Sequence, residues 1–222
     1  MSASPPSAPL LTIARASRTD PAERARLARR GRLLAWAGNV WHLAEFAIAL
    51  AAGLAASSVA LVGFALDSLI ELAAGLVIVW LLRRDRHASA AAERRAGRLI
   101  AASYFALAGY IVVESAYAVV AGDHPEVSVV GIALALVTAV TMPFLAIAKR
   151  RVGGALGSSA TAREGTQNML CAYLSVALLV GLGLNALVGW WWADPAAALV
   201  IAAVAAREGA AGWRGEICSC CA

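Results

Sequence analysis

The chain has 222 residues, of which 61% are hydrophobic and 15% are charged, and its mean hydropathy is +0.72. This composition excludes a soluble domain and is typical of a protein that crosses the membrane several times. The formal net charge is +5, but the basic residues flank long uncharged stretches. We therefore expect contact with lipid headgroups and not with nucleic acid.

The N-terminal part, residues 1–31, is rich in Pro, Ser and Ala and then in Arg, which predicts a disordered basic arm without a secretory signal. Its Arg-rich end is either a short amphipathic helix on the lipid surface or the charge that keeps the N-terminus inside. Residues 32–207 predict an all-α domain, a polytopic bundle of six membrane-spanning helices. The first four expected spans are 33–56, 59–82, 99–122 and 127–148, the last with Pro143 as a kink. The fifth lies within residues 161–190, and the sixth starts at residue 194 and either ends near residue 206 or continues through the GAAGW stretch.

The distribution of charge predicts the topology of this bundle. All nineteen Lys and Arg residues fall in the N-terminal arm, the link between the second and third spans, the link between the fourth and fifth (with Arg163 at the start of the fifth helix), or the C-terminal end. The other three turns contain none, which is the positive-inside pattern of a cell-membrane protein with both termini in the cytoplasm. Residues 208–222 are expected to form a short cytoplasmic tail.

The second span carries two carboxylates near its middle, Asp67 and Glu71. Four residues apart on a helix, they project from the same face. Each acid costs roughly 3 kcal/mol at the bilayer centre, whereas each Leu, Ile, Val or Phe contributes roughly 0.3–0.6 kcal/mol. No Lys or Arg falls within a predicted span, so these acids are either protonated or visited by a cation, and we favour the cation.

The first span contains a polar stripe of Asn39, His42 and Glu45. These residues either form a hydrogen-bonded trio that ties the helix to its neighbours, or place Glu45 in the same polar cavity as the acids of the second span. In the second case Glu45 acts as a proton carrier or an outer-shell ligand. His42 is a further possible ligand, although a lone histidine is more often structural.

The fifth helix presents Glu164, Gln167 and Cys171 with spacings of three and four. If the helix begins near residue 161, Cys171 lies roughly 15 Å along it, close to the level of the acids on the second span. A cysteine in an apolar helix is usually a small core residue, but beside carboxylates it is also a candidate zinc ligand. Glu164 is a further candidate for an outer-shell or proton-coupling role.

Three cysteines near the C-terminus form a compact thiol cluster. They suggest cytosolic capture of a soft metal ion, acylation, or a dispensable tail. The cluster consists of Cys218, Cys220 and Cys221.

The spans resemble the cation diffusion facilitator (cation efflux) family from about residue 39 to residue 207. The resemblance rests on NVWHLAE in the first helix, SSVALVGFALDSLIELAAG in the second, and ATAREGTQNMLCAYLSVALLVGLGLNALVGWWWADPAAALVIA across the fifth and sixth. Members of this family are homodimers of six-helix protomers that export divalent cations, most often zinc, in exchange for protons. The chain looks like a membrane-domain member without the family's C-terminal cytoplasmic domain.

The resemblance also implies a metal site. The family's pair on the second helix corresponds to Asp67 and Glu71, and its pair on the fifth helix corresponds to Gln167 and Cys171. The family usually has His or Asp and then Asp at the latter two positions, so this site is softer than usual.

Together these features predict a transporter that exports a divalent cation by proton-coupled alternating access, with zinc as the favoured cargo. The alternatives are a softer cargo such as cadmium or copper, and a non-transporting or metal-sensing protein on the same scaffold. No nucleophile–base set or phosphate loop is present in the sequence, so an enzyme is not expected.

Overall fold

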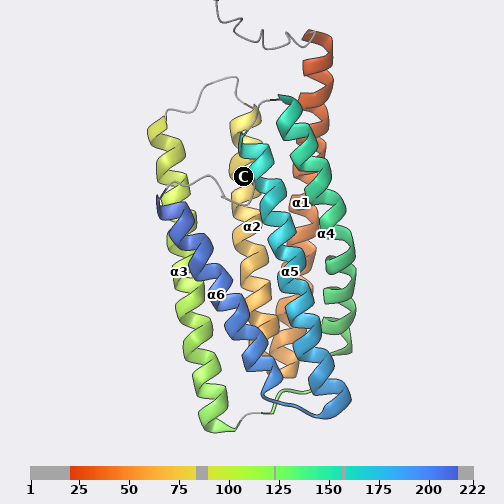
Figure 1. The fold of residues 1–222 in the computed structure, drawn as a ribbon, viewed down its shortest axis with the longest axis vertical. Coiled ribbons are helices and arrows are strands. Elements are labelled where there is room, and N and C mark those ends of the chain that lie inside the picture. The colour runs from red at the N-terminus through yellow and green to blue at the C-terminus, as the bar shows by residue number, and fades with distance from the viewer. Residues whose placement is uncertain (1–20, 84–89, 123, 157–158, 215–222) are drawn as a thin grey trace, which may run out of the picture.

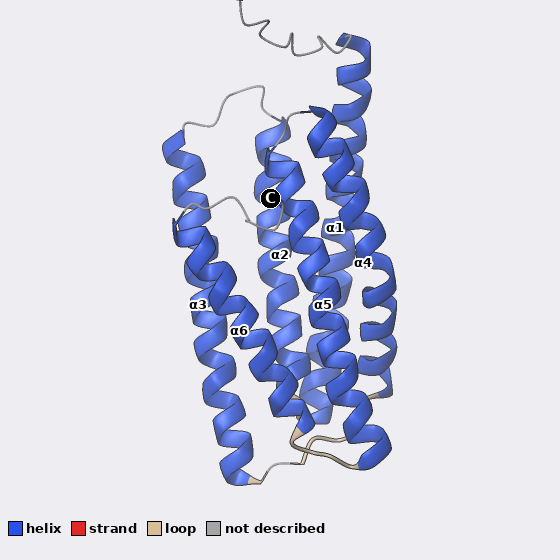
Figure 2. Ribbon diagram, in the orientation of Figure 1, coloured by secondary structure: helices blue, strands red, loops and turns tan. Residues whose placement is uncertain are grey.

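A computed structural model describes residues 21–83, 90–122, 124–156 and 159–214. Within these ranges the chain forms six helices, and Figure 2 shows no strand among them. All six are long and apolar enough to cross a membrane, as expected from the sequence. They are α1 (Pro21–Ala56), α2 (Val59–Arg83), α3 (Ala90–Ala121), α4 (Val129–Leu156), α5 (Ser159–Val188) and α6 (Ala193–Arg214).

The helices run alternately up and down, so the three short turns α1–α2, α3–α4 and α5–α6 lie at one end of the bundle (Figure 1). Two of these turns follow glycines with positive φ, Gly122 (68°) and Gly189 (71°), a conformation that glycine adopts without steric cost. Helix α2 packs against α1, α3, α5 and α6. It therefore occupies the centre of the bundle, which places its acids among several neighbours.

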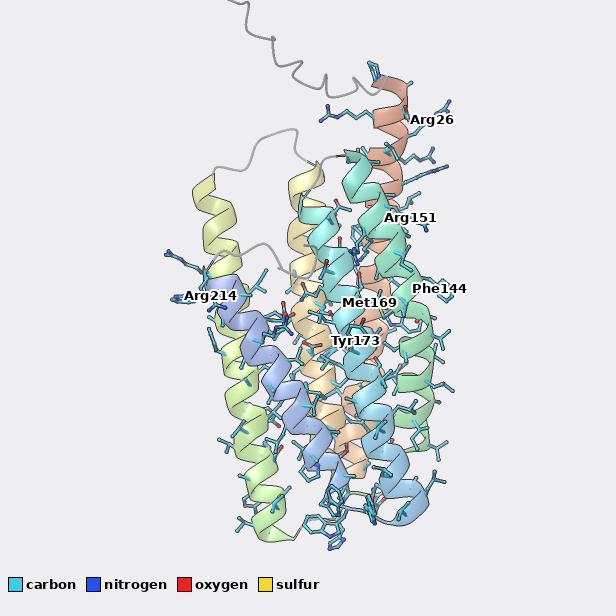
Figure 3. The ribbon with its side chains drawn as sticks, viewed as in Figure 1. Arg26, Phe144, Arg151, Met169, Tyr173 and Arg214 are labelled. Atoms are coloured by element: carbon cyan, nitrogen blue, oxygen red, sulfur yellow. The ribbon has the colours of Figure 1, made fainter. Side chains whose placement is uncertain are left out.

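The outer surface of the bundle is apolar, as the lipid environment requires. Val120, Phe144 and Leu187 are 88%, 72% and 89% exposed, and Phe144 points away from the bundle in Figure 3. Polar side chains such as Asn39, which is 2% exposed, lie in the interior instead. The polar side chains that could bind an ion therefore lie along the bundle axis, away from lipid.

Several helix limits differ from the sequence-based expectation. Helix α1 begins at Pro21, so the prediction of a disordered arm is wrong for residues 21–31, and residues 1–20 lie outside the described ranges. Helix α6 continues to Arg214, past the predicted tail boundary. The predicted link between the fourth and fifth spans is mostly helical, because α4 continues to Leu156 and α5 starts at Ser159. Apolar run length finds the lipid-spanning part of a helix but not its polar extensions.

Helices α4 and α5 approach each other closely, and small residues make this possible. A Cβ atom at Gly153 would lie 2.6 Å from the backbone nitrogen of Ala162, and one at Gly165 would lie 2.8 Å from the backbone oxygen of Ala146. Glycines at such positions let two backbones pack in direct contact, as they commonly do between membrane helices. The same approach brings polar side chains at the basic ends of these helices together.

Candidate metal centre

Helix α1 presents its polar stripe to the interior of the bundle. Asn39, His42 and Glu45 are 2%, 3% and 1% exposed. Residues three apart lie on one helix face, and in α1 this face packs against α2 and α4. His42 and Glu45 thus point toward the helix that carries Glu71.

Four side chains from three helices converge at this level. Ligand atoms of His42, Glu45, Glu71 and Cys171 all lie within 4.8 Å of one another, and all four residues are buried. The Nδ1 atom of His42 is 3.1 Å from Glu71 Oε2 and 3.3 Å from Glu45 Oε2. The Sγ atom of Cys171 lies 3.8 Å from Glu45 Oε2. We call these four residues the metal centre.

The spacing of these atoms suits a small metal ion. Zinc bonds of about 2.0–2.3 Å in a tetrahedral site imply ligand atoms about 3.3–3.8 Å apart. The measured separations of 3.1, 3.3 and 3.8 Å fall at or near this range. One imidazole, two carboxylates and one thiol are also the residue types that zinc prefers.

The carboxylate of Glu45 is held by donors from its own helix and from two others. Its Oε1 accepts hydrogen bonds from Thr138 Oγ1 (2.5 Å) and Trp41 Nε1 (3.4 Å), and its Oε2 accepts one from Ser68 Oγ (2.9 Å). These donors fix the orientation of the carboxylate group. Glu45 is therefore anchored in one orientation beside the other members of the metal centre.

The carboxylate of Glu71 is held much less completely. Its Oε2 has no hydrogen-bond partner within the described part of the chain, although His42 Nδ1 lies 3.1 Å away. The described residues also bring no Lys or Arg within ion-pair distance of Glu71. A buried oxygen without a partner costs free energy, and a bound cation would remove that cost.

Two of the predicted ligands lie outside this compact group. Asp67 is buried at 4% exposure and lies one helical turn from Glu71. The amide of Gln167 donates a hydrogen bond to the hydroxyl of Tyr104 on α3. Of the four residues predicted from the resemblance, the structure brings together Glu71 and Cys171.

Among the residues that the structure describes, a lysine lies inside the bundle, contrary to the expectation that no Lys or Arg falls within a span. Lys149 is fully buried in α4, and its Nζ donates to Glu164 Oε1 at 2.6 Å. Sequence reasoning placed Lys149 with the neighbouring arginines in a cytoplasmic link. Its spacing indicates its burial, because it continues the inward face of α4 formed by Thr138, Met142 and Ala146.

Sequence reasoning also missed Asn168, whose amide connects Lys149 to the metal centre. Asn168 is 1% exposed, and its Nδ2 atom lies 3.0 Å from His42 Nε2. The available signal was its position on α5, where it is one turn from both Glu164 and Cys171 and shares their face. The cysteines at positions 218, 220 and 221 lie outside the described residues.

Comparison with protein families agrees with this architecture. Residues 36–211 match the cation efflux transmembrane domain. The chain therefore belongs to the cation efflux family and is a multi-pass membrane protein from a family of metal cation transporters rather than enzymes. A comparison with curated proteins finds no match.

Proposed function

We propose that this protein exports a divalent cation from the cytoplasm by proton-coupled alternating access through the metal centre. Zinc is the first candidate for the transported ion. The observation that carries the proposal is the convergence of His42, Glu45, Glu71 and Cys171 in the bundle interior, with one oxygen of Glu71 lacking a hydrogen bond within the described residues. Intramembrane acids of this kind mark ion pathways.

Proton exchange follows from the chemistry of the ligands. Carboxylates and thiols bind a metal in their deprotonated forms, so metal binding releases protons and reprotonation releases the metal. In each state a positive charge, either the cation or protons, neutralises the acids in the bundle. This exchange explains how several acids persist at membrane depth.

Asp67 and Gln167 are proposed ligands on either side of the metal centre along the bundle axis. Asp67 lies one turn from Glu71 toward the α1–α2 turn, and Gln167 lies one turn from Cys171 toward the start of α5, at the opposite end of the bundle. Each residue would therefore hold the ion at one end of its path through the metal centre. Alternating access would thereby move the ion along the bundle.

The proposed orientation places both termini in the cytoplasm of the cell. Arg26 and Arg151 lie toward the same end of the bundle (Figure 3), opposite the three short turns. Positively charged residues favour the cytoplasmic side, so the turn containing Val127, which is 53% exposed, faces outward. A cysteine introduced at Val127 should then react with an impermeant thiol reagent added to intact cells.

The family resemblance supports a homodimer as the working assembly. A mass measurement of the detergent-solubilised protein, corrected for bound detergent, should give about twice the 22.8 kDa of one chain. A monomeric mass would contradict the dimer without affecting the proposal for transport.

Reconstitution in liposomes tests the proposed function directly. A zinc gradient should drive proton movement in the opposite direction, and Asp67→Ala should abolish this coupled flux while the protein stays folded. Glu126→Gln is the matched control, because Glu126 is an exposed acid in a turn and its loss should leave the flux unchanged. Unchanged flux in Asp67→Ala would remove Asp67 from the mechanism, and absence of zinc flux in the wild type would reject zinc transport.

Two alternatives make different predictions in the same experiment. A metal sensor would bind zinc without moving it, so zinc binding without flux would favour that function. A carrier for a softer ion would transport cadmium or copper in preference to zinc, which the thiol of Cys171 makes chemically reasonable. Competition between metals in the flux assay separates these cases.

A further inference from the structure

The strongest feature that the proposed transport mechanism leaves unused is the buried ammonium of Lys149. Its Nζ donates to Glu164 Oε1 at 2.6 Å and to Asn168 Oδ1 at 2.8 Å. Gly38 on α1 leaves room for it, because a Cβ atom there would lie 2.5 Å from Nζ. Residues of α1, α4 and α5 thus surround the Lys149 ammonium closely. Its contact with Asn168 connects it to the metal centre.

The ammonium determines which way the amide of Asn168 points. A lysine ammonium only donates hydrogen bonds, so Asn168 must present its oxygen to Lys149. Its Nδ2 then donates toward His42 Nε2 at 3.0 Å. His42 Nε2 is therefore an acceptor, and the proton of the neutral ring lies on Nδ1, which faces Glu71 and Glu45 at 3.1 and 3.3 Å.

This arrangement conflicts with metal binding by His42. A neutral imidazole that binds a metal through Nδ1 carries its proton on Nε2, and this N–H normally donates to an oxygen. Here Nε2 meets the amide NH₂ of Asn168, so the ligating form of the ring would place two donors against each other. His42 can ligate only if the amide turns and Lys149 releases its oxygen.

We propose that Lys149 and Asn168 form an interlock on His42: while Lys149 holds the amide oxygen, His42 is kept in the tautomer that does not bind metal. This inference builds on the proposed metal centre. On metal capture the amide turns, His42 releases its Nδ1 proton to water and takes up one from water at Nε2, and the amide oxygen accepts this Nε2–H, so the ring stays neutral. Lys149 keeps its contact with Glu164, whose Oε2 has no hydrogen-bond partner among the described residues and is available to accept the released N–H.

The interlock predicts that removing Lys149 tightens zinc binding, the opposite of what a merely structural lysine would do. The double variant Lys149→Met/Glu164→Gln removes one positive and one negative charge, so the net charge is preserved. It leaves the Asn168 amide free to turn, and we expect zinc to bind about tenfold more tightly, at the lower end of typical outer-shell effects. Affinity is measured by competition with a fluorescent zinc chelator in detergent, and weaker or unchanged binding in a folded variant would overturn the interlock.

A second variant protects the test against misfolding of the first. Asn168→Asp/Glu164→Gln also preserves net charge, keeps an acceptor for Lys149 and offers a carboxylate oxygen to His42 Nε2–H. It should likewise bind zinc about tenfold more tightly than the wild type. Weaker or unchanged zinc binding would contradict the interlock.

The ring tautomer gives a readout that does not depend on metal. Nitrogen-15 NMR of the metal-free protein at alkaline pH should show His42 with its proton on Nδ1 in the wild type and on Nε2 in Asn168→Asp/Glu164→Gln. The signals of His87 and His124 are identified by their Gln variants. A wild-type ring with its proton on Nε2 would overturn the interlock. Absence of zinc binding in the wild type would instead count against the proposed function, and the NMR result would still decide the interlock.

Discussion

Two buried carboxylate sites of this protein differ in how completely their oxygens are satisfied. At the end of the bundle that carries the three short turns, Asp194 of α6 accepts hydrogen bonds from Ser58 Oγ at 2.5 Å and from the Ala60 backbone nitrogen at 3.3 Å. Ser58 in turn caps α2 by accepting from the Leu61 nitrogen at 3.1 Å. In the metal centre, Glu71 Oε2 has no such partner within the described chain.

This difference distinguishes a structural acid from a proposed metal ligand. Asp194 completes a helix N-terminus, where backbone donors and the helix dipole both favour a negative charge. Glu71 lies in the interior beside an imidazole, a thiol and a second carboxylate, and a bound cation would compensate its charge. Substitution of Asp194 should therefore affect folding, and substitution of Glu71 should affect metal binding.

The largest expected effect is that of Glu71→Gln on zinc affinity. Loss of a charged ligand should weaken zinc binding by more than about 100-fold, beyond the 10–100-fold typical of outer-shell partners. Thermal stability should not fall, because a neutral amide of the same size replaces a poorly satisfied buried charge. Chelator competition and thermal unfolding measure the two quantities. A Glu71→Gln variant that is less stable than the wild type but binds zinc normally would assign Glu71 a structural role.

The second largest expected effect is a loss of stability in Asp194→Ala, with zinc affinity retained. Removal of the carboxylate leaves Ser58 and the first turn of α2 without their acceptor, which should lower the free energy of unfolding by about 2 kcal/mol. Zinc affinity should stay within about twofold of the wild type, since no member of the metal centre contacts Asp194. Denaturant unfolding in detergent gives the stability, and a large loss of zinc affinity would show that the two sites are coupled.

A smaller effect is expected for metal preference in Cys171→Ser. The hydroxyl keeps the shape of the side chain but is a harder ligand than the thiolate, so the preference for cadmium over zinc should fall by about tenfold, or roughly 1.4 kcal/mol. The ratio of the two affinities, measured under the same buffer conditions, tests this. An unchanged ratio would assign Cys171 to packing, the structural alternative for a buried cysteine.

Much of the fold could be predicted from the sequence. The second span was expected at 59–82, and helix α2 covers Val59–Arg83, because about 20 apolar residues are what a bilayer requires. The early start of the fifth helix, which places Cys171 at the level of Glu71, is also confirmed. The basic extensions of α1 and α4 were missed because their polar residues resemble a surface link.

The metal centre was only partly predictable, for a physical reason. Helical spacing gives the face on which a residue lies but not the height or rotation at which neighbouring helices meet. Hence His42 and Glu45, expected to be structural or outer-shell residues, lie within contact of Glu71 and Cys171. Asp67 and Gln167, expected to be direct ligands, lie outside that group.

The sequence by itself determined that six apolar helices cross a membrane with a few acids among them, since this follows from composition, run length and spacing. Only the tertiary structure decided which acid is satisfied and which is not. It brought Lys149 from an apparently cytoplasmic basic cluster into contact with Glu164 and Asn168, because α4 and α5 pack at glycines. Hydrogen-bond satisfaction depends on contacts between helices, and no pattern within one helix contains that information.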